Sequence, residues 1–237
     1  MQRIDLVTPW GKSVGGMYRE DTNDIGVLQS CILHDEYNLQ TYNLVPGQIV
    51  IDIGAHIGAA TLAMCSLGLQ VISVEPLAEN VQILKQNLAL NGFESQCTIL
   101  QRAAASKSNQ SLSVFHMSDA TEFTRAHRFI GHVVPRTEEM RGRAEIVKTI
   151  SLHDIMQGIS KCALLKIDCE GSEWDVFKDI QEDVLRRIQY IVGEAHVSCG
   201  WKDEERNMFK LVEEYFIDLS PEKNSALFSF KNKSWVA

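Results

Sequence analysis

A short apolar run followed by two glycines most constrains what this chain can fold into. Residues 49–53 read Ile-Val-Ile-Asp-Ile, a mostly β-branched run that predicts a strand buried on both faces. A glycine turn from Gly54 to Gly58 and a helical run from Ala59 to Leu67 follow. A strand, a glycine turn and a helix in that order are typical of a nucleotide-binding corner in an α/β fold.

The spacing of these glycines favours one class of cofactor. From Asp52 to Gly58 the pattern is Asp-x-Gly-x-x-x-Gly. A dinucleotide site uses Gly-x-Gly-x-x-Gly, because the pyrophosphate needs a tighter glycine set on a helix N-terminus. Gly54 allows a sharp turn, and Gly58 lets a cofactor approach the backbone closely. The pattern favours S-adenosyl-methionine (SAM), and an NAD(P)-dependent oxidoreductase is the alternative.

An acidic residue ends the next predicted strand. Residues 70–74 form that strand, and Glu75-Pro76 follows it. A carboxylate here can accept hydrogen bonds from both hydroxyls of a ribose, while Pro76 removes a backbone donor and fixes the turn. An acidic residue at this point also fits NAD. Glu75 therefore indicates a ribose without deciding the cofactor.

Strands and helices alternate along the rest of the chain. Further strands are expected at 97–101, 111–115, 163–167 and 189–193, helices at 77–91, 151–156, 172–180 and 208–215, and a closing hairpin at 226–230 and 234–236. This order predicts an α/β fold with a doubly wound, mostly parallel sheet and an antiparallel C-terminal edge hairpin. Ligands of such sheets bind beyond the carboxyl ends of the strands, where every motif described here falls.

We expect residues 1–237 to form a single domain with two irregular parts. Residues 1–46 are an N-terminal lead-in of short strands and a helix. Residues 116–145 form an insertion rich in arginine and histidine, including Arg125, Arg128 and Arg136. Loops of this length are usually functional or disordered. The insertion is expected to be a substrate lid that meets an anionic acceptor, or else a solvated mobile segment.

Composition excludes several classes of function. The chain is 45% hydrophobic and 23% charged, and its first residues lack the apolar core of a signal peptide. No apolar run approaches the roughly 20 residues that span a bilayer. We therefore expect a cytoplasmic protein without a membrane partner. A net charge of −8 argues against a nucleic-acid partner. Six cysteines without a Cys-x-x-Cys pair indicate reduced thiols, and no metal site is predicted.

Polar side chains that end two later strands are the candidates for chemistry. Asp168 ends one strand, and Glu194 and His196 end another that is expected beside it. They could hold an acceptor, act as a base or bind a divalent cation. His196 suits the base best because imidazole titrates near neutrality, although a packing histidine is the alternative. Lys166 should share a strand face, and an ion pair, with Asp168. Tyr37 is expected to close over the cofactor.

With these residues in place, the chain resembles the FkbM family of SAM-dependent methyltransferases. The matching stretches are residues 50–58, Val74-Glu75-Pro76 and, most distinctively, Leu165-Lys166-Ile167-Asp168-Cys169-Glu170-Gly171-Ser172-Glu173. The resemblance implies a class I methyltransferase fold and methyl transfer, mostly to hydroxyl or carboxylate oxygen of natural products and glycans. The residues that it places in the cofactor pocket are Asp52, Gly54, Ala55, Gly58, Glu75 and Ala104. His56 stands within the same turn, where the family more often has asparagine.

The sequence thus predicts a SAM-dependent O-methyltransferase with a small-molecule or glycan acceptor. Two alternatives stay open: the NAD(P)-dependent oxidoreductase, and a module that binds SAM without catalysis and serves a partner. The strand end at Asp168-Cys169-Glu170-Gly171 lacks the Asp/Asn-Pro-Pro-Tyr arrangement of many enzymes that methylate planar nitrogens. This absence favours an oxygen acceptor.

Overall fold

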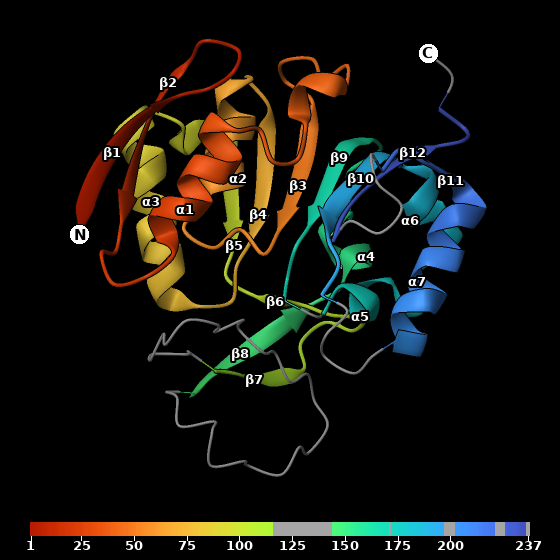
Figure 1. The fold of residues 1–237 in the computed structure, drawn as a ribbon. Helices are drawn as coiled ribbons and strands as arrows, with labels where there is room; N and C mark the ends of the chain where they lie inside the picture. The colour runs from red at the N-terminus through yellow and green to blue at the C-terminus, as the bar shows by residue number, and fades with distance from the viewer. Residues whose placement is uncertain (116–143, 171, 197–201, 221–225, 236–237) are drawn as a thin grey trace.

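A computed structural model of the chain describes residues 1–115, 144–170, 172–196, 202–220 and 226–235 (Figure 1). The basic residues of the insertion, from Arg125 to Arg143, lie outside the described residues. Residues 144 and 145, which the sequence assigned to the insertion, belong instead to a strand.

The centre of the fold is a seven-stranded sheet in the order β11-β12-β10-β9-β3-β4-β5. Its strands are β3 (Ile49–Ile53), β4 (Gln70–Val74), β5 (Cys97–Leu100), β9 (Cys162–Ile167), β10 (Ile188–Glu194), β11 (Phe216–Asp218) and β12 (Leu227–Asn232). Strands β5, β4, β3, β9 and β10 run parallel to one another, whereas β12 is antiparallel to β10 and β11. The predicted fold class, a mostly parallel sheet with an antiparallel edge, is confirmed.

The edge hairpin differs in one strand from the prediction. Strand β12 pairs with β11, not with residues 234–236. Ser234 follows in a turn because the Asn232 side chain accepts hydrogen bonds from Ser234 N (2.9 Å) and Oγ (2.7 Å). The Asn232 amide also donates to the carbonyls of Leu185 and Ile188, which fixes the end of β12 against the start of β10.

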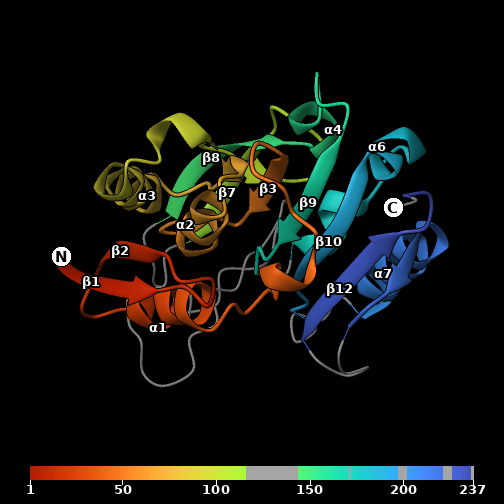
Figure 2. The same ribbon diagram turned by 90° about the horizontal axis from the view of Figure 1, so that it is seen from above.

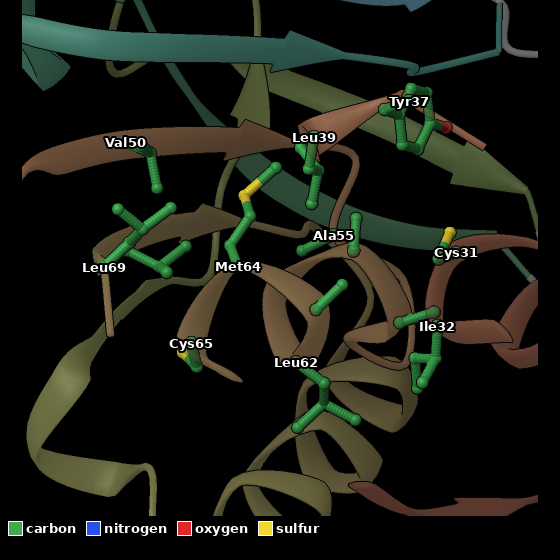
Figure 3. Close-up of a cluster of buried hydrophobic side chains, with 14 of the residues drawn as sticks. Cys31, Ile32, Tyr37, Leu39, Val50, Ala55, Leu62, Met64, Cys65 and Leu69 are labelled. Carbon is green, nitrogen blue, oxygen red and sulfur yellow. The ribbon is translucent and has the colours of Figure 1, made fainter. Parts of the chain in front are cut away.

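Helices cover both faces of the sheet (Figures 1 and 2). The helices are α2 (Ala59–Ser66) and α3 (Ala78–Asn91) on one face, and α4 (Leu152–Ile155), α5 (Glu173–Phe177), α6 (Glu182–Arg186) and α7 (Lys202–Tyr215) on the other. Successive residues of β3 pack into opposite clusters, Val50 with α2 and Ile51 with α4. Figure 3 shows Val50 in one cluster with Met64 of α2 and Leu39 of the lead-in. The prediction that β3 is buried on both faces is confirmed.

The lead-in packs on the α2–α3 side. It contains the antiparallel hairpin of β1 (Gln2–Val7) and β2 (Ser13–Tyr18), the helix α1 (Asp24–Leu28), a π-helical turn η1 (Gln29–Leu33) and a 3-10 turn η2 (Leu39–Thr41). Two asparagines of α3 hold the edge of β2. Asn91 bonds to both N and O of Gly15 at 2.8 Å, and Asn87 accepts from Met17 N. The side-chain amides thus form hydrogen bonds with backbone groups of β2 that would otherwise pair with a neighbouring strand.

A small sheet in the order β6-β8-β7 extends beyond the main sheet (Figure 1). It consists of β6 (Ala103–Ala104), β7 (Ser111–Phe115) and β8 (Ala144–Ile150). Strand β8, which the sequence analysis missed, follows directly after the basic insertion. Val147 and Thr149 are buried while Ile146 is 76% exposed, so β8 has the alternation of a half-buried strand.

Two further features concern the cysteines and the apolar character of the helices. The cysteines that the structure describes, which are Cys31, Cys65, Cys97, Cys162 and Cys169, all carry free thiols. Within the described ranges, none of the helices combines the length and the apolar character needed to cross a bilayer.

Candidate functional site

The carboxyl ends of β3, β4 and β9 meet at one edge of the sheet. Gly54 N and Ala55 N, which follow β3, both donate to the last carbonyl of β4, at Val74 (2.9 and 3.1 Å). Asp168 N, which follows β9, donates to Ile53 O at 3.1 Å. Backbone hydrogen bonds therefore fix the predicted motifs relative to one another before any side chain contributes.

The glycine turn is pressed against the end of β9. Gly54 has a φ of +78°, and a Cβ added there would lie 1.8 Å from the Asp168 carbonyl oxygen. Gly58 has a φ of +95°, and a Cβ there would lie 2.3 Å from Leu84 of α3. The turn thus needs glycine for internal packing as well as for its backbone angles.

Glu75 is held at the end of β4 by its neighbours. The side chain is buried, and its Oε2 accepts from His56 N at 2.9 Å. Its Oε1 accepts from Leu77 N (3.0 Å) and Asn80 Nδ2 (3.2 Å). Because a carboxylate oxygen has two lone pairs, Oε2 keeps acceptor capacity for a further donor. Glu75 is thus a pre-oriented acceptor at the position expected for a ribose.

The lead-in reaches this corner through Arg19, which sequence reasoning missed. The Arg19 guanidinium donates to Asp24 (2.8 Å) and Asn80 (3.0 Å) and lies 3.2 Å from His56 Nε2. Burial opposes the Asp24 carboxylate, but the hydrogen bonds from Arg19 outweigh burial and lower the pKa of Asp24. His56 has a φ of +52°. It is contacted by Arg19 of the lead-in, and no sequence pattern near the turn indicates this contact.

A buried lysine links the turn to the end of β9. Lys166 is 3% exposed. Its Nζ lies 3.2 Å from Asp52 Oδ1 and 3.7 Å from Asp168 Oδ2, and it donates to Gly54 O at 3.0 Å. Burial opposes the ammonium, but the charges of Asp52 and Asp168 outweigh it and raise the pKa of Lys166. The predicted pairing with Asp168 is present.

Asp52 occupies the interior end of this contact. Its side chain is fully buried, and Oδ2 accepts from Thr61 Oγ1 at 2.6 Å. Thr61 in turn contacts Ser73 Oγ at 2.7 Å. Both oxygens of the Asp52 carboxylate are therefore used inside the protein, one by Lys166 and one by Thr61. Asp52 contributes to the strand ends by holding Lys166 in place.

Tyr37, which the sequence analysis expects to close over the cofactor, contacts Asp168 after β9. The Tyr37 hydroxyl donates to Asp168 Oδ2 at 2.8 Å, and burial raises the pKa of Tyr37. The preceding residue, Glu36, was not singled out from the sequence. Burial, together with the charges of Asp168 and Glu194, raises the pKa of Glu36. A second lead-in segment therefore closes on the end of β9.

His196 lies among carboxylates. Its Nδ1 is 3.2 Å from Glu173 Oε1, and its Nε2 is 3.5 Å from Glu170, 3.8 Å from Asp168 and 4.0 Å from Glu194. Burial opposes the imidazolium, but the hydrogen bond to Glu173 and the surrounding negative charges raise the pKa of His196 to about 9. This differs from the expectation that the ring titrates near neutrality, because the carboxylates stabilise its charged form.

The remaining residues predicted to bind the cofactor have apolar side chains, so they could contribute only packing surface. Ala55, Pro76 and Ala104 are all buried at strand ends. The edge of the sheet therefore has two parts: Glu75 with its donors, and Asp168 with Glu194 and His196. Lys166 lies between them.

Comparison with known families gives one match over most of the chain. Residues 52–226 match the family described as "Methyltransferase FkbM domain". A curated relative, the AMB antimetabolite synthetase AmbE of Pseudomonas aeruginosa, is 23% identical over 222 residues. That alignment covers 81% of this chain but 10% of the synthetase, so the chain spans a small part of that relative's length.

Solved structures show the same fold. The methyltransferase FkbM from Methylobacillus flagellatus KT has 16% identity and a TM-score of 0.52, over 82% of this chain and 46% of that one. A putative rRNA-methylase from Clostridium thermocellum has 9% identity and a TM-score of 0.51, over 84% of this chain and 94% of that one. At these identities the likeness establishes the fold alone.

The close contact between Gly54 and the end of β9 predicts how much stability is lost when a methyl group is added at Gly54. Gly54→Ala should lower the free energy of unfolding strongly, because the new Cβ collides with the Asp168 carbonyl oxygen. Gly47→Ala is the matched control: its φ is +85°, but nothing lies within 4 Å of the new Cβ. That control should cost only about 1–2 kcal/mol for the left-handed backbone. Urea denaturation measures both, and equal losses would show that the turn is not pressed against β9.

Proposed function

Because the chain belongs to the FkbM methyltransferase family, we propose that it transfers a methyl group from SAM to an oxygen atom of a small-molecule or glycan acceptor. The proposal treats residues 1–237 as one methyltransferase domain, with the lead-in packed on it and residues 116–143 as its lid. One observation supports this function best: the oriented carboxylate of Glu75 and the polar cluster around Asp168 lie at the same edge of the sheet.

The strand ends suit SAM in shape and charge. Glu75 would accept hydrogen bonds from the adenosine ribose through Oε2, and the buried turn from Gly54 to Gly58 would border the cofactor, with His56, Ala55 and Pro76 beside it. SAM carries a sulfonium and an ammonium group, and the carboxylate of Asp168 would stabilise positive charge there. When bound, SAM supplies an electrophilic methyl group. The glycine spacing and the family favour it over NAD(P).

The acceptor would lie against Asp168, Glu194 and His196. Methyl transfer to a hydroxyl forms an oxygen–carbon bond, breaks the sulfur–carbon bond with its electron pair left on sulfur, and releases the hydroxyl proton. The side chains of Asp168, Glu194 and His196 would position the hydroxyl, and the carboxylate of Asp168 or Glu194 would take up that proton, because the raised pKa of His196 keeps its ring protonated near neutrality. A carboxylate acceptor is disfavoured because Asp168, Glu170 and Glu194 would repel it. The proposal therefore narrows the acceptor group to a hydroxyl.

A nucleic-acid acceptor is the second candidate, since one structural neighbour is a putative rRNA-methylase. The net charge of −8 and the carboxylates around His196 weigh against a polyphosphate partner. A basic segment at 116–143 would be the surface for any anionic part of the acceptor.

Glu75→Gln tests the cofactor half of the proposal. Losing the charged acceptor should weaken SAM binding by roughly 10- to 150-fold, since hydrogen bonds to charged groups contribute about 1.5–3 kcal/mol. Glu94→Gln removes the same charge from an exposed side chain away from the strand ends and should leave affinity unchanged. Calorimetric titration with SAM and with NAD measures both. Unchanged SAM affinity in Glu75→Gln, or tighter binding of NAD, would refute the assignment.

Substitutions at the second cluster test the acceptor half. Asp168→Asn and His196→Gln should each lower kcat for methyl transfer from labelled SAM by about 10²–10⁴, the usual contribution of general acid–base catalysis. Glu194→Gln should lower it less, since this side chain lies at the rim, 38% exposed. Asp183→Asn on α6 serves as the control for loss of a carboxylate. Full turnover in both Asp168→Asn and His196→Gln would exclude these residues as catalytic groups.

A further inference from the structure

We propose that His196 Nε2 and the carboxylates of Asp168, Glu170 and Glu194 hold a divalent cation, with Glu173 orienting the histidine ring. The sequence leaves a divalent cation at Asp168, Glu194 and His196 open but predicts no metal site, because the cluster that the sequence shows is small. The site assembles from two strand ends, β9 and β10, that are neighbours in the sheet.

The geometry around His196 Nε2 carries the proposal. The side chain is 9% exposed, and Nε2 makes no hydrogen bond within the part of the chain that the structure describes. It faces carboxylate oxygens of Glu170, Asp168 and Glu194 at 3.5, 3.8 and 4.0 Å. These separations exceed a hydrogen bond. They match the spacing of about 3–4 Å between two ligands that bind one ion at about 2.0–2.2 Å.

The other ring nitrogen is held as metal-binding histidines usually are. Nδ1 lies 3.2 Å from Glu173 Oε1, and the same oxygen accepts from Cys169 N at 2.7 Å. A carboxylate on the second nitrogen fixes the ring orientation, so that Nε2 becomes a ligand when the ion displaces its proton. Ligand atoms of Asp168, Glu173 and His196 lie within 4.8 Å of one another.

The carboxylates differ in burial. Asp168 is held by the Tyr37 hydroxyl at 2.8 Å and by Lys166 at 3.7 Å. Glu170 and Glu194 lie nearer the surface, at 40% and 38% exposed. One imidazole nitrogen with several carboxylate oxygens suits a cation such as Mn²⁺ or Mg²⁺.

The consequence for catalysis rests on the proposed function. A cation at this place would bind the acceptor hydroxyl and make it easier to deprotonate, while it neutralises the carboxylates that surround it. Its binding to the protein requires neither SAM nor acceptor. The ion is therefore measurable by itself.

Mn²⁺ binding, followed by the loss of the free-ion signal in electron paramagnetic resonance, tests the site without cofactor or acceptor. The wild-type chain should bind one Mn²⁺ that Mg²⁺ competes away. His196→Gln should weaken binding at least 10-fold. Glu173→Gln should weaken it about 10- to 100-fold, as changes to metal-orienting residues typically do. Glu182→Gln, an exposed carboxylate on α6, should bind like wild type.

Circular dichroism and SAM titration of each variant establish that it is folded. The proposal is overturned if wild type binds no Mn²⁺ at millimolar concentration, or if His196→Gln and Glu173→Gln both bind as wild type does. Mn²⁺ binding without methyl transfer would refute the proposed function and leave the cation site standing. If methyl transfer is unaffected by a chelator and no Mn²⁺ binds, the cation site is refuted and the proposed function stands.

Discussion

The burial of one ammonium group fixes the arrangement of the whole sheet edge. A charged lysine inside a protein is tolerated only when opposite charges and acceptors surround it. Lys166 meets that requirement with Asp52 on β3, the Gly54 carbonyl in the turn and Asp168 after β9. These groups belong to two segments of the chain, residues 52–54 and 166–168, which must come together for the charge to be accommodated. The turn and the end of β9 are therefore positioned by the same interaction.

The two parts of the site are held in different ways, and only Asp168 contacts Lys166 directly. The carboxylate of Glu75 is oriented by local donors from His56, Leu77 and Asn80, so it follows directly from the turn. Asp168 contacts Lys166 of the strand that it follows, and it also contacts Tyr37 and His196, which come from two other segments of the chain. Its geometry is thus a property of the assembled fold. A methyl donor and an acceptor need such a fixed relation, because the reacting atoms must lie in line at about 3–3.5 Å.

Sequence reasoning succeeded where the signal is local. The strands β3, β4 and β9 and the pairing of Lys166 with Asp168 each follow from periodicity or spacing within a few residues. The family resemblance rests on the same stretches, and the match over residues 52–226 confirms it.

What the sequence missed depends on contacts across long separations. Arg19 and Glu36 lie in a lead-in without periodicity, and only the packing of that segment on α2 and α3 brings them to the site. Strand β8 was missed because the apolar residues Ile146 and Val147 are adjacent and the buried Thr149 is polar, so that its sequence has no clear alternation. The raised pKa of His196 arises from Glu173 on α5 and from Glu170 and Asp168 after β9, and the sequence around His196 does not contain that information.

The central claim is that Lys166 and Asp52 act as one buried unit. A double-mutant cycle tests it most directly, using Lys166→Met, Asp52→Asn and the double variant, with the free energy of unfolding measured by urea denaturation. Removing one partner of a buried pair should cost about 3–5 kcal/mol because the other charge is left without compensation. The double variant should cost far less than the sum of the two single changes. Additive costs would contradict the account, since they would mean that the two side chains stabilise the sheet edge independently.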